Sequence, residues 1–297
     1  GYSQSFRDNY CAAMKYEPNC SLPNTHDRNV LRTGTSSVCG PTPTLAAQQT
    51  VGFNMLRHDT TSDAILSIAA AIKEATNRKI LILLLYGDVL GGDYVSHPDK
   101  FAGNLQSFGY LSAKKLIDSP DIDGFANSPG YATQQRAVTT PFSVDHLYTS
   151  IAAHGKLSII LDDTRGVMIK KGHKGYGMKF CHTTQCTTNV MRRNMLANLV
   201  SNRAIYSFGG EGWDGRNDTA SDRATTAAIW RMFKESRAAM QKATPMQGPL
   251  PQPETAVFFD ERASLAQPTF GIGVGSYGIA GVSKEILHMG APARWYY

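Results

Sequence analysis

The sequence predicts an α/β fold: the C-terminal part of a (β/α)8 TIM-type barrel followed by the start of a small α/β domain. Strand-like apolar runs alternate with helix-like segments along the chain, which is typical of a parallel sheet. Each predicted strand ends in a polar, Gly-rich or acidic loop, and barrels carry their function at such strand ends. Residues 1–43 show no strand pattern, so we expect roughly half a barrel; a four-strand Rossmann-like sheet is the alternative.

The elements are assigned from periodicity and from the turn residues that bound them. A long helix is expected over 45–75, with a cap at Ser62 or Asp63 inside that range, and a further helix over residues 1–16. The apolar run 80–86 (ILILLLY) has the length of a buried strand. The other predicted helices cover 101–117, 143–154, 188–202 and 222–242, and the other predicted strands lie within 121–129 and at 156–161 and 204–208.

A Pro-rich linker, residues 246–254, divides the chain into two units. Residues 1–245 form the barrel portion, with a Cys-containing loop region at its start, and residues 255–297 begin the small domain. TAVFFDERAS (255–264) is predicted as a strand followed by polar residues. The glycines of FGIGVGSYGIAG (270–281) do not follow the dinucleotide-binding spacing, which favours a loop there.

Composition limits the function classes. The chain has 297 residues and 42% hydrophobic content, enough for a sizeable core. Its net charge is +6, but the basic residues are scattered and match no nucleic-acid-binding motif, so no nucleic-acid partner is expected. No apolar run is long enough for a membrane span. The eight histidines form no metal-binding spacing, and no cofactor is expected.

Cysteines and glycosylation sequons predict the compartment. The five cysteines suit two disulfides and one unpaired thiol, which occur in secreted proteins. Two sequons, at Asn19 and Asn217, agree with this and mark both residues as glycosylation sites. We therefore expect a secretory, extracellular or organelle-lumen location. The chain starts at Gly1 without a signal peptide, and both ends are expected to be cut.

Several segments occur in an order that resembles a known family. They are GYSQSFRDNY, LIDSPDIDGFANSPGYATQQR, SIAAHGKLSIILDDTRG and TAVFFDERAS. The set is similar to β-galactosidase-type glycoside hydrolases, in particular family 42 and its barrel relatives, and covers most of residues 1–163. The resemblance implies a (β/α)8 barrel, a following α/β domain of the kind that supports trimers, and a retaining mechanism with two glutamates. It also implies that the acid/base glutamate lies before Gly1, outside this chain.

The position of the nucleophile departs from that family. In the relatives, the strand after HGKL ends in Glu, whereas here Leu161 stands at that place and Asp162, Asp163, Thr164 and Arg165 follow it. A retaining mechanism needs a carboxylate about 5–5.5 Å from its partner, and Leu161 has none. Adjacent strand residues face opposite sides of a sheet, so Asp162 or Asp163 replaces the glutamate only if the strand end bulges.

The remaining candidates are sugar ligands. Tyr86 and Tyr131 are single aromatics that either stack on a sugar or pack in the core. Trp213, between glycines, is the better aromatic platform, and Glu211 is either a surviving sugar ligand or a solvated loop residue. Arg165 either contacts substrate or forms an ion pair with Asp163 that shapes the loop. The substrate-binding candidates are therefore Arg165, Tyr86, Tyr131, Glu211 and Trp213.

Two functions follow from these residues. The favoured one is a divergent or truncated glycoside-hydrolase-like protein that has lost catalysis and serves a structural, assembly or glycan-binding role. The alternative is an active retaining glycosidase that uses Asp162 or Asp163 with an acid/base glutamate outside this chain. Partners expected from these readings are a glycan, another chain or an N-terminal segment that completes the barrel, and further copies in a homo-oligomer or larger assembly.

Overall fold

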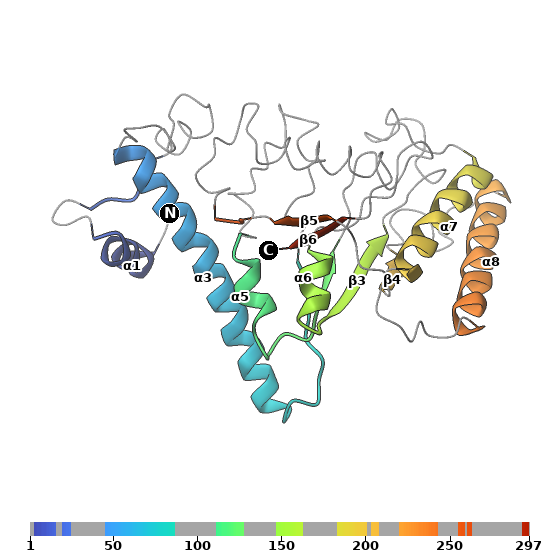
Figure 1. Cartoon of the computed structure of the whole chain (residues 1–297), viewed down its shortest axis with the longest axis horizontal. Coiled ribbons are helices and arrows are strands. Elements are labelled where there is room, and N and C mark those ends of the chain that lie inside the picture. Colours follow the sequence, from blue (N-terminus) through green and yellow to red (C-terminus); the bar gives the residue numbers. More distant parts are fainter. Residues whose placement is uncertain are drawn as a thin grey trace.

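The structure, a computed structural model, describes residues 3–15, 20–24, 45–86, 111–127, 147–162, 183–200, 203–207, 220–242, 255–258, 260–262 and 293–296. Its centre is a four-stranded parallel sheet in the order β1-β2-β3-β4 (Figure 1). The spatial order follows the chain order, without the reversal that marks a doubly wound sheet. Within the described residues the sheet is not closed. The strands are β1 (Leu83–Leu85), β2 (Gly124–Asn127), β3 (Leu157–Asp162) and β4 (Ala204–Ser207).

Helices alternate with these strands, as the sequence predicts. The long helix α3 (Leu45–Ala75) has the predicted bounds. Its predicted internal cap is wrong, because the helix runs without a break through Ser62, which is buried and donates a hydrogen bond to the Ser112 carbonyl. The other helices are α1 (Gln4–Met14), α5 (Ala113–Ile117), α6 (Tyr148–Ala153), α7 (Thr184–Val200) and α8 (Ala220–Lys242).

The two faces of the sheet differ sharply. One, the covered face, carries Leu84, Tyr86, Phe125, Asn127, Ile160 and Asp162. Helices α6 and α7 contact β3. Residues of α3, α5 and α6 form one apolar core with β1 and β2. Phe125 and Ile160 on this face are fully buried. The other, the open face, carries Leu83, Leu85, Ala126, Leu157, Ile159, Leu161 and Tyr206. Leu85 is 73% exposed and Tyr206 58% exposed there.

An ion pair fastens the amino-terminal edge of the sheet to α3. Lys73 Nζ lies 2.5 Å from Asp123 Oδ2 and also donates to the Ile80 carbonyl. The same carboxylate oxygen accepts the Ile82 amide at 2.7 Å. Burial alone raises the pKa of Asp123, but the hydrogen bonds from Lys73 and Ile82 and the charges of Lys73 and Lys156 outweigh it, so the pKa lies below its ordinary value. Asp123 therefore joins a helix and two strands.

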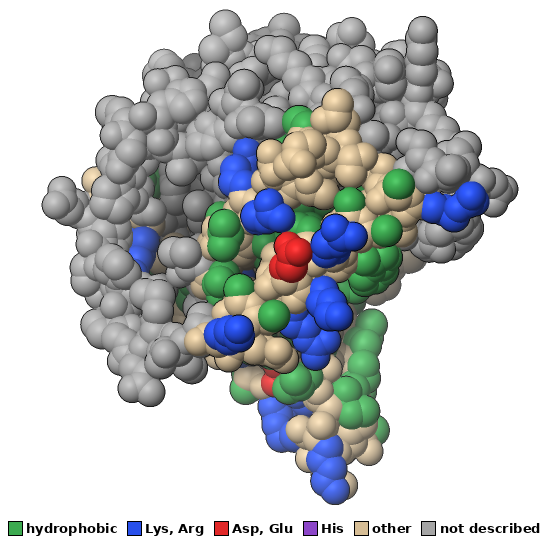
Figure 2. All heavy atoms as spheres, turned by 90° about the vertical axis from the view of Figure 1, so that its right-hand side faces the viewer, with side chains coloured by type: hydrophobic (Ala, Val, Ile, Leu, Met, Phe, Trp, Pro, Cys, Tyr) green, Lys and Arg blue, Asp and Glu red, His purple; other side chains and the backbone are tan. Residues whose placement is uncertain are grey.

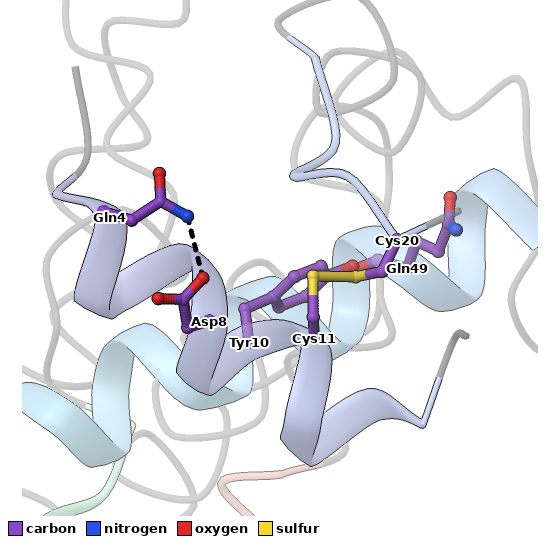
Figure 3. The surroundings of a disulfide bond; sticks show 6 residues. All are labelled: Gln4, Asp8, Tyr10, Cys11, Cys20 and Gln49. Carbon is purple, nitrogen blue, oxygen red and sulfur yellow. Dashed lines mark hydrogen bonds between the residues drawn. A yellow bond between two sulfur atoms is a disulfide. The ribbon is translucent and has the colours of Figure 1, made fainter. Parts of the chain in front are cut away.

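The N-terminal segment packs on α3 through aromatic side chains and carries a disulfide of its own, which Figure 3 shows beside Tyr10. Phe6 and Tyr10 of α1 both meet Phe53 of α3 edge-on, and the Tyr10 hydroxyl donates to the Gln49 carbonyl at 3.0 Å. Cys11 is bonded to Cys20, which closes the chain after the helix. Cys186 on α7 is disulfide-bonded as well. Disulfide-bonded cysteines therefore occur both in the N-terminal segment and on α7.

The C-terminal piece contributes two parallel strands, β5 (Thr255–Phe258) and β6 (Ala293–Tyr296). The sequence predicts β5 but misses β6, whose four residues offer too short a pattern. Glu261, just after β5, accepts a hydrogen bond from the Ala113 amide of α5 at 2.8 Å and so ties this piece to the helices of the larger sheet. Burial raises the pKa of Glu261 even though this amide and that of Lys114 stabilise its charged form. The linker 246–254 and the predicted domain bounds lie outside the described residues.

Candidate functional site

The candidate site is the carboxyl-terminal edge of the sheet, and β3 supplies its central residues. Leu161 pairs with Tyr206 and Asp162 with Ser207 in an unbroken parallel register. The strand therefore has no bulge up to Asp162, and the two neighbours point to opposite faces. Leu161 lies half-buried on the open face, whereas Asp162 is 1% exposed on the covered face. The position at which the sequence resemblance predicts a nucleophile is thus occupied by an apolar side chain.

Asp162 belongs to a buried polar network with α7. The Asn194 side-chain amide donates to Asp162 Oδ1 at 3.3 Å, and the Arg193 guanidinium donates from Nε and Nη2 to Asn194 Oδ1 at 3.2 and 2.9 Å. Burial lowers the pKa of Arg193, and the charge of Asp162 opposes that shift. A carboxylate held in this way has the environment of a structural acid that joins strand to helix.

Two further residues of this edge lie within the covered face. Tyr86, which follows β1, is 2% exposed, and its ring meets Phe125 edge-on with centroids 6.0 Å apart. A ring so deeply placed in the core leaves almost no surface for a sugar. Asn127 ends β2 and is 1% exposed; among the described residues its side-chain amide has no hydrogen-bond partner. Neither side chain points to the open face beside Leu161.

The other candidates of the sequence analysis lie outside the described residues. These are Asp163, Arg165, Tyr131, Glu211 and Trp213, together with the two glycosylation asparagines, Asn19 and Asn217. The structure therefore brings together Leu161, Asp162 and Tyr86 around the edge of the sheet and leaves the roles of the others as predictions.

Sequence reasoning did not find Arg193 and Asn194, the α7 partners of Asp162. A signal exists in the sequence, because Thr187, Met191, Asn194 and Asn198 follow one another at the spacing of one helix face. All four are buried. Two asparagines on the inward face of a helix indicate a buried polar partner. That partner is supplied by the last residue of β3.

No group of His, Cys, Asp or Glu side chains in the described part of the chain is suited to hold a metal ion. Within the same residues, no helix is both long and apolar enough to cross a bilayer. Comparisons of the chain with protein-family models, with curated proteins and with solved structures gave no match.

Proposed function

We propose that the chain is a glycoside-hydrolase-like barrel portion that has lost catalysis and serves a structural, assembly or glycan-binding role. The observation that carries the proposal is the regular end of β3. It directs Leu161, not a carboxylate, to the open face, and it directs Asp162 into the network with Asn194. Retaining glycosidases need a carboxylate at that place. Asp162 instead accepts a hydrogen bond from Asn194 and so helps to hold α7 against the sheet.

The barrel part of the proposal rests on the strand order and on the open face. Strands that follow one another in chain order with right-handed crossovers place all their helices on one side, as in a barrel wall. Parallel sheets are normally covered on both faces, yet Leu83, Leu85 and Leu157 are well exposed here. Further parallel strands, from a preceding segment or from another chain, would close the sheet and bury these side chains.

Turnover of an aryl β-galactoside by the protein in its full natural length, with any partner chain present, tests the loss of catalysis. We expect no hydrolysis above the uncatalysed rate. Hydrolysis that persists in Asp162→Asn but disappears in Asp163→Asn would overturn the proposal and assign the nucleophile to Asp163. Hydrolysis abolished by Asp162→Asn, in a variant that retains the wild-type thermal transition, would overturn it in favour of Asp162.

The Leu161→Glu variant provides the complementary measurement. If only the nucleophile is lost, this variant gains turnover in the complete barrel, where an acid/base glutamate is supplied from outside the chain. The matched control is Leu161→Gln, which has nearly the same shape and no carboxylate. Equal turnover in the two variants would show that the carboxylate is not the missing group.

A further inference from the structure

The helical pair α7 and α8 has a strong excess of basic over acidic residues. The two helices hold seven basic and two acidic residues, a net charge of +5, and the whole chain has +6. Figure 2 shows Lys and Arg side chains gathered around an acidic one on the side of the molecule that these helices present. The helical pair therefore presents a locally basic surface.

Part of this surface is a straight stripe along α8, which we call the α8 stripe. Its members are Arg223, Trp230, Lys234 and Arg237, separated by seven, four and three positions, so they share one face of the helix. All four side chains are exposed. The opposite face of α8 carries Ile229 and Met232, which pack against Met191 and Met195 of α7. The stripe therefore points away from the helix pair.

Trp230 is unusual for a solvated helix face. It is 61% exposed, and its ring lies against Phe233 with centroids 6.0 Å apart, which supports one side of the indole and leaves much of it in solvent. The acid that α8 places beside the stripe, Glu235, lies 3.7 Å from Arg192 of α7. Glu235 is therefore paired with a basic residue outside the stripe, and the charged residues within the stripe itself are all basic.

We infer that the α8 stripe binds an acidic polysaccharide, with the exposed Trp230 stacked on a sugar ring and the exposed Lys234 and Arg237 on its carboxylate or sulfate groups. From Arg223 to Arg237 the stripe spans about 21 Å along the helix axis, long enough for several sugar residues. This site lies on the outer side of α8 and does not depend on the proposed loss of catalysis at Leu161.

Two other polyanions fit the surface less well. A lipid surface is bound in proportion to the apolar area that enters it, and the stripe offers one large apolar side chain between charged ones. Single-stranded nucleic acid also combines basic and stacking contacts. However, disulfide-bonded Cys11, Cys20 and Cys186 indicate an oxidising compartment, where acidic glycans rather than nucleic acids are the common polyanions.

Calorimetric titration of the purified full chain with heparin and with polygalacturonate tests this inference. Lys234→Glu/Arg237→Glu should weaken binding at least about tenfold and flatten its dependence on salt, because fewer counterions are displaced. Trp230→Ala should weaken binding about fivefold, by loss of stacking, and leave the salt dependence unchanged. The matched control is Lys15→Glu/Lys79→Glu, which makes the same change in net charge at exposed lysines of other segments and should bind as the wild type does.

Four results would overturn the inference. The first is an absence of binding to both polysaccharides at low salt, and the second is an equal loss of affinity in the control variant. The third is tighter binding to phosphatidylserine vesicles or to single-stranded DNA through the same residues. Unchanged binding by Trp230→Ala would also contradict it, since charge alone would then account for affinity. If the double variant lacks a thermal transition, Lys234→Gln/Arg237→Gln replaces it.

Discussion

The covered and the open face of the same four strands obey different rules. On the covered face, Asp162 is buried and accepts a hydrogen bond from Asn194, and just before β2 Asp123 pairs with Lys73. On the open face, apolar groups such as Leu85 and Tyr206 are exposed. A one-residue step along β3 changes the environment completely, from Leu161 to Asp162. The difference teaches that an acid in a catalytic-looking sequence motif can serve the packing of a helix, because strand alternation decides which face it meets.

The largest expected effect is at Gly124 of β2, where the neighbouring strands leave no space for a side chain on the open face. A Cβ added there would lie 2.6 Å from Leu157 Cβ and 2.7 Å from the Leu157 carbonyl oxygen. The backbone of the neighbouring strand would have to shift to make room for the added methyl group. Gly124→Ala should therefore lower the free energy of unfolding by about 3 kcal/mol. Urea denaturation measures this. An unchanged midpoint would show that the centre of the open face has room.

The next effect is at Asp123 on the covered face. Asp123→Asn removes the charge partner of Lys73, which is 4% exposed, and should cost about 2–3 kcal/mol at neutral pH. The pKa of Asp123 is lower folded than unfolded. Its contribution is therefore present above the unfolded pKa of about 3.9 and is lost as the pH falls through the folded value.

The pH dependence and a matched pair check this assignment. Thermal unfolding between neutral and strongly acidic pH should show a shallower acid loss of stability in Asp123→Asn than in the wild type. The control is Asp121→Asn, which removes the surface pair with Arg78, itself 53% exposed, and should cost below about 1 kcal/mol. Equal losses of stability in both variants would contradict the larger contribution expected of the Lys73–Asp123 ion pair.

A smaller effect is expected for the network at the end of β3. Asp162→Ala leaves the Asn194 amide without its acceptor and should cost about 1–2 kcal/mol. In a double-mutant cycle, Asp162→Ala and Asn194→Ala should be less than additive, since each removes the same hydrogen bond. Chemical denaturation of the four proteins gives the coupling. Strictly additive losses of stability would show that Asp162 does not interact with Asn194. That result would weaken the argument against a catalytic role of Asp162.

The smallest effect is expected on the exposed part of the open face. Leu85→Lys should change the stability of this chain by no more than about 0.5 kcal/mol, because the side chain is already 73% exposed. The same substitution should be strongly destabilising in any assembly that closes the sheet, since it would then bury a charge. The thermal midpoints of wild type and Leu85→Lys, measured both for the isolated chain and for that assembly, distinguish the two cases.

Much of the fold could be predicted from the sequence because its signals are local. The long apolar periodicity gives α3 its bounds, and the glycine after His154 marks the end of α6, where Gly155 adopts a φ of +67°. The strands at 156–161 and 204–208 are confirmed within a residue or two by β3 and β4. These elements are determined by patterns that need no knowledge of distant contacts.

The site was harder to predict because the roles of its residues depend on contacts with distant parts of the chain. The sequence places Leu161 and Asp162 on opposite faces, but it does not show that the face of Asp162 is filled by α7. The partner Asn194 lies 32 positions further along the chain. Ser62 failed as a helix cap for a similar reason: its hydroxyl finds an acceptor at Ser112 of a distant turn, so it sits inside a continuous helix.

The length of α3 has a mechanical consequence. The helix has 31 residues, about 46 Å of rigid rod. Near one end Phe53 packs against Tyr10 of α1, and near the other end Lys73 forms its ion pair with Asp123. Tension applied through α1 would travel along this helix to its contacts with the rest of the fold, the apolar core around Ala69 and the Lys73–Asp123 ion pair. The helix would then act as a lever arm that transmits a pull on the N-terminal segment to the edge of the sheet.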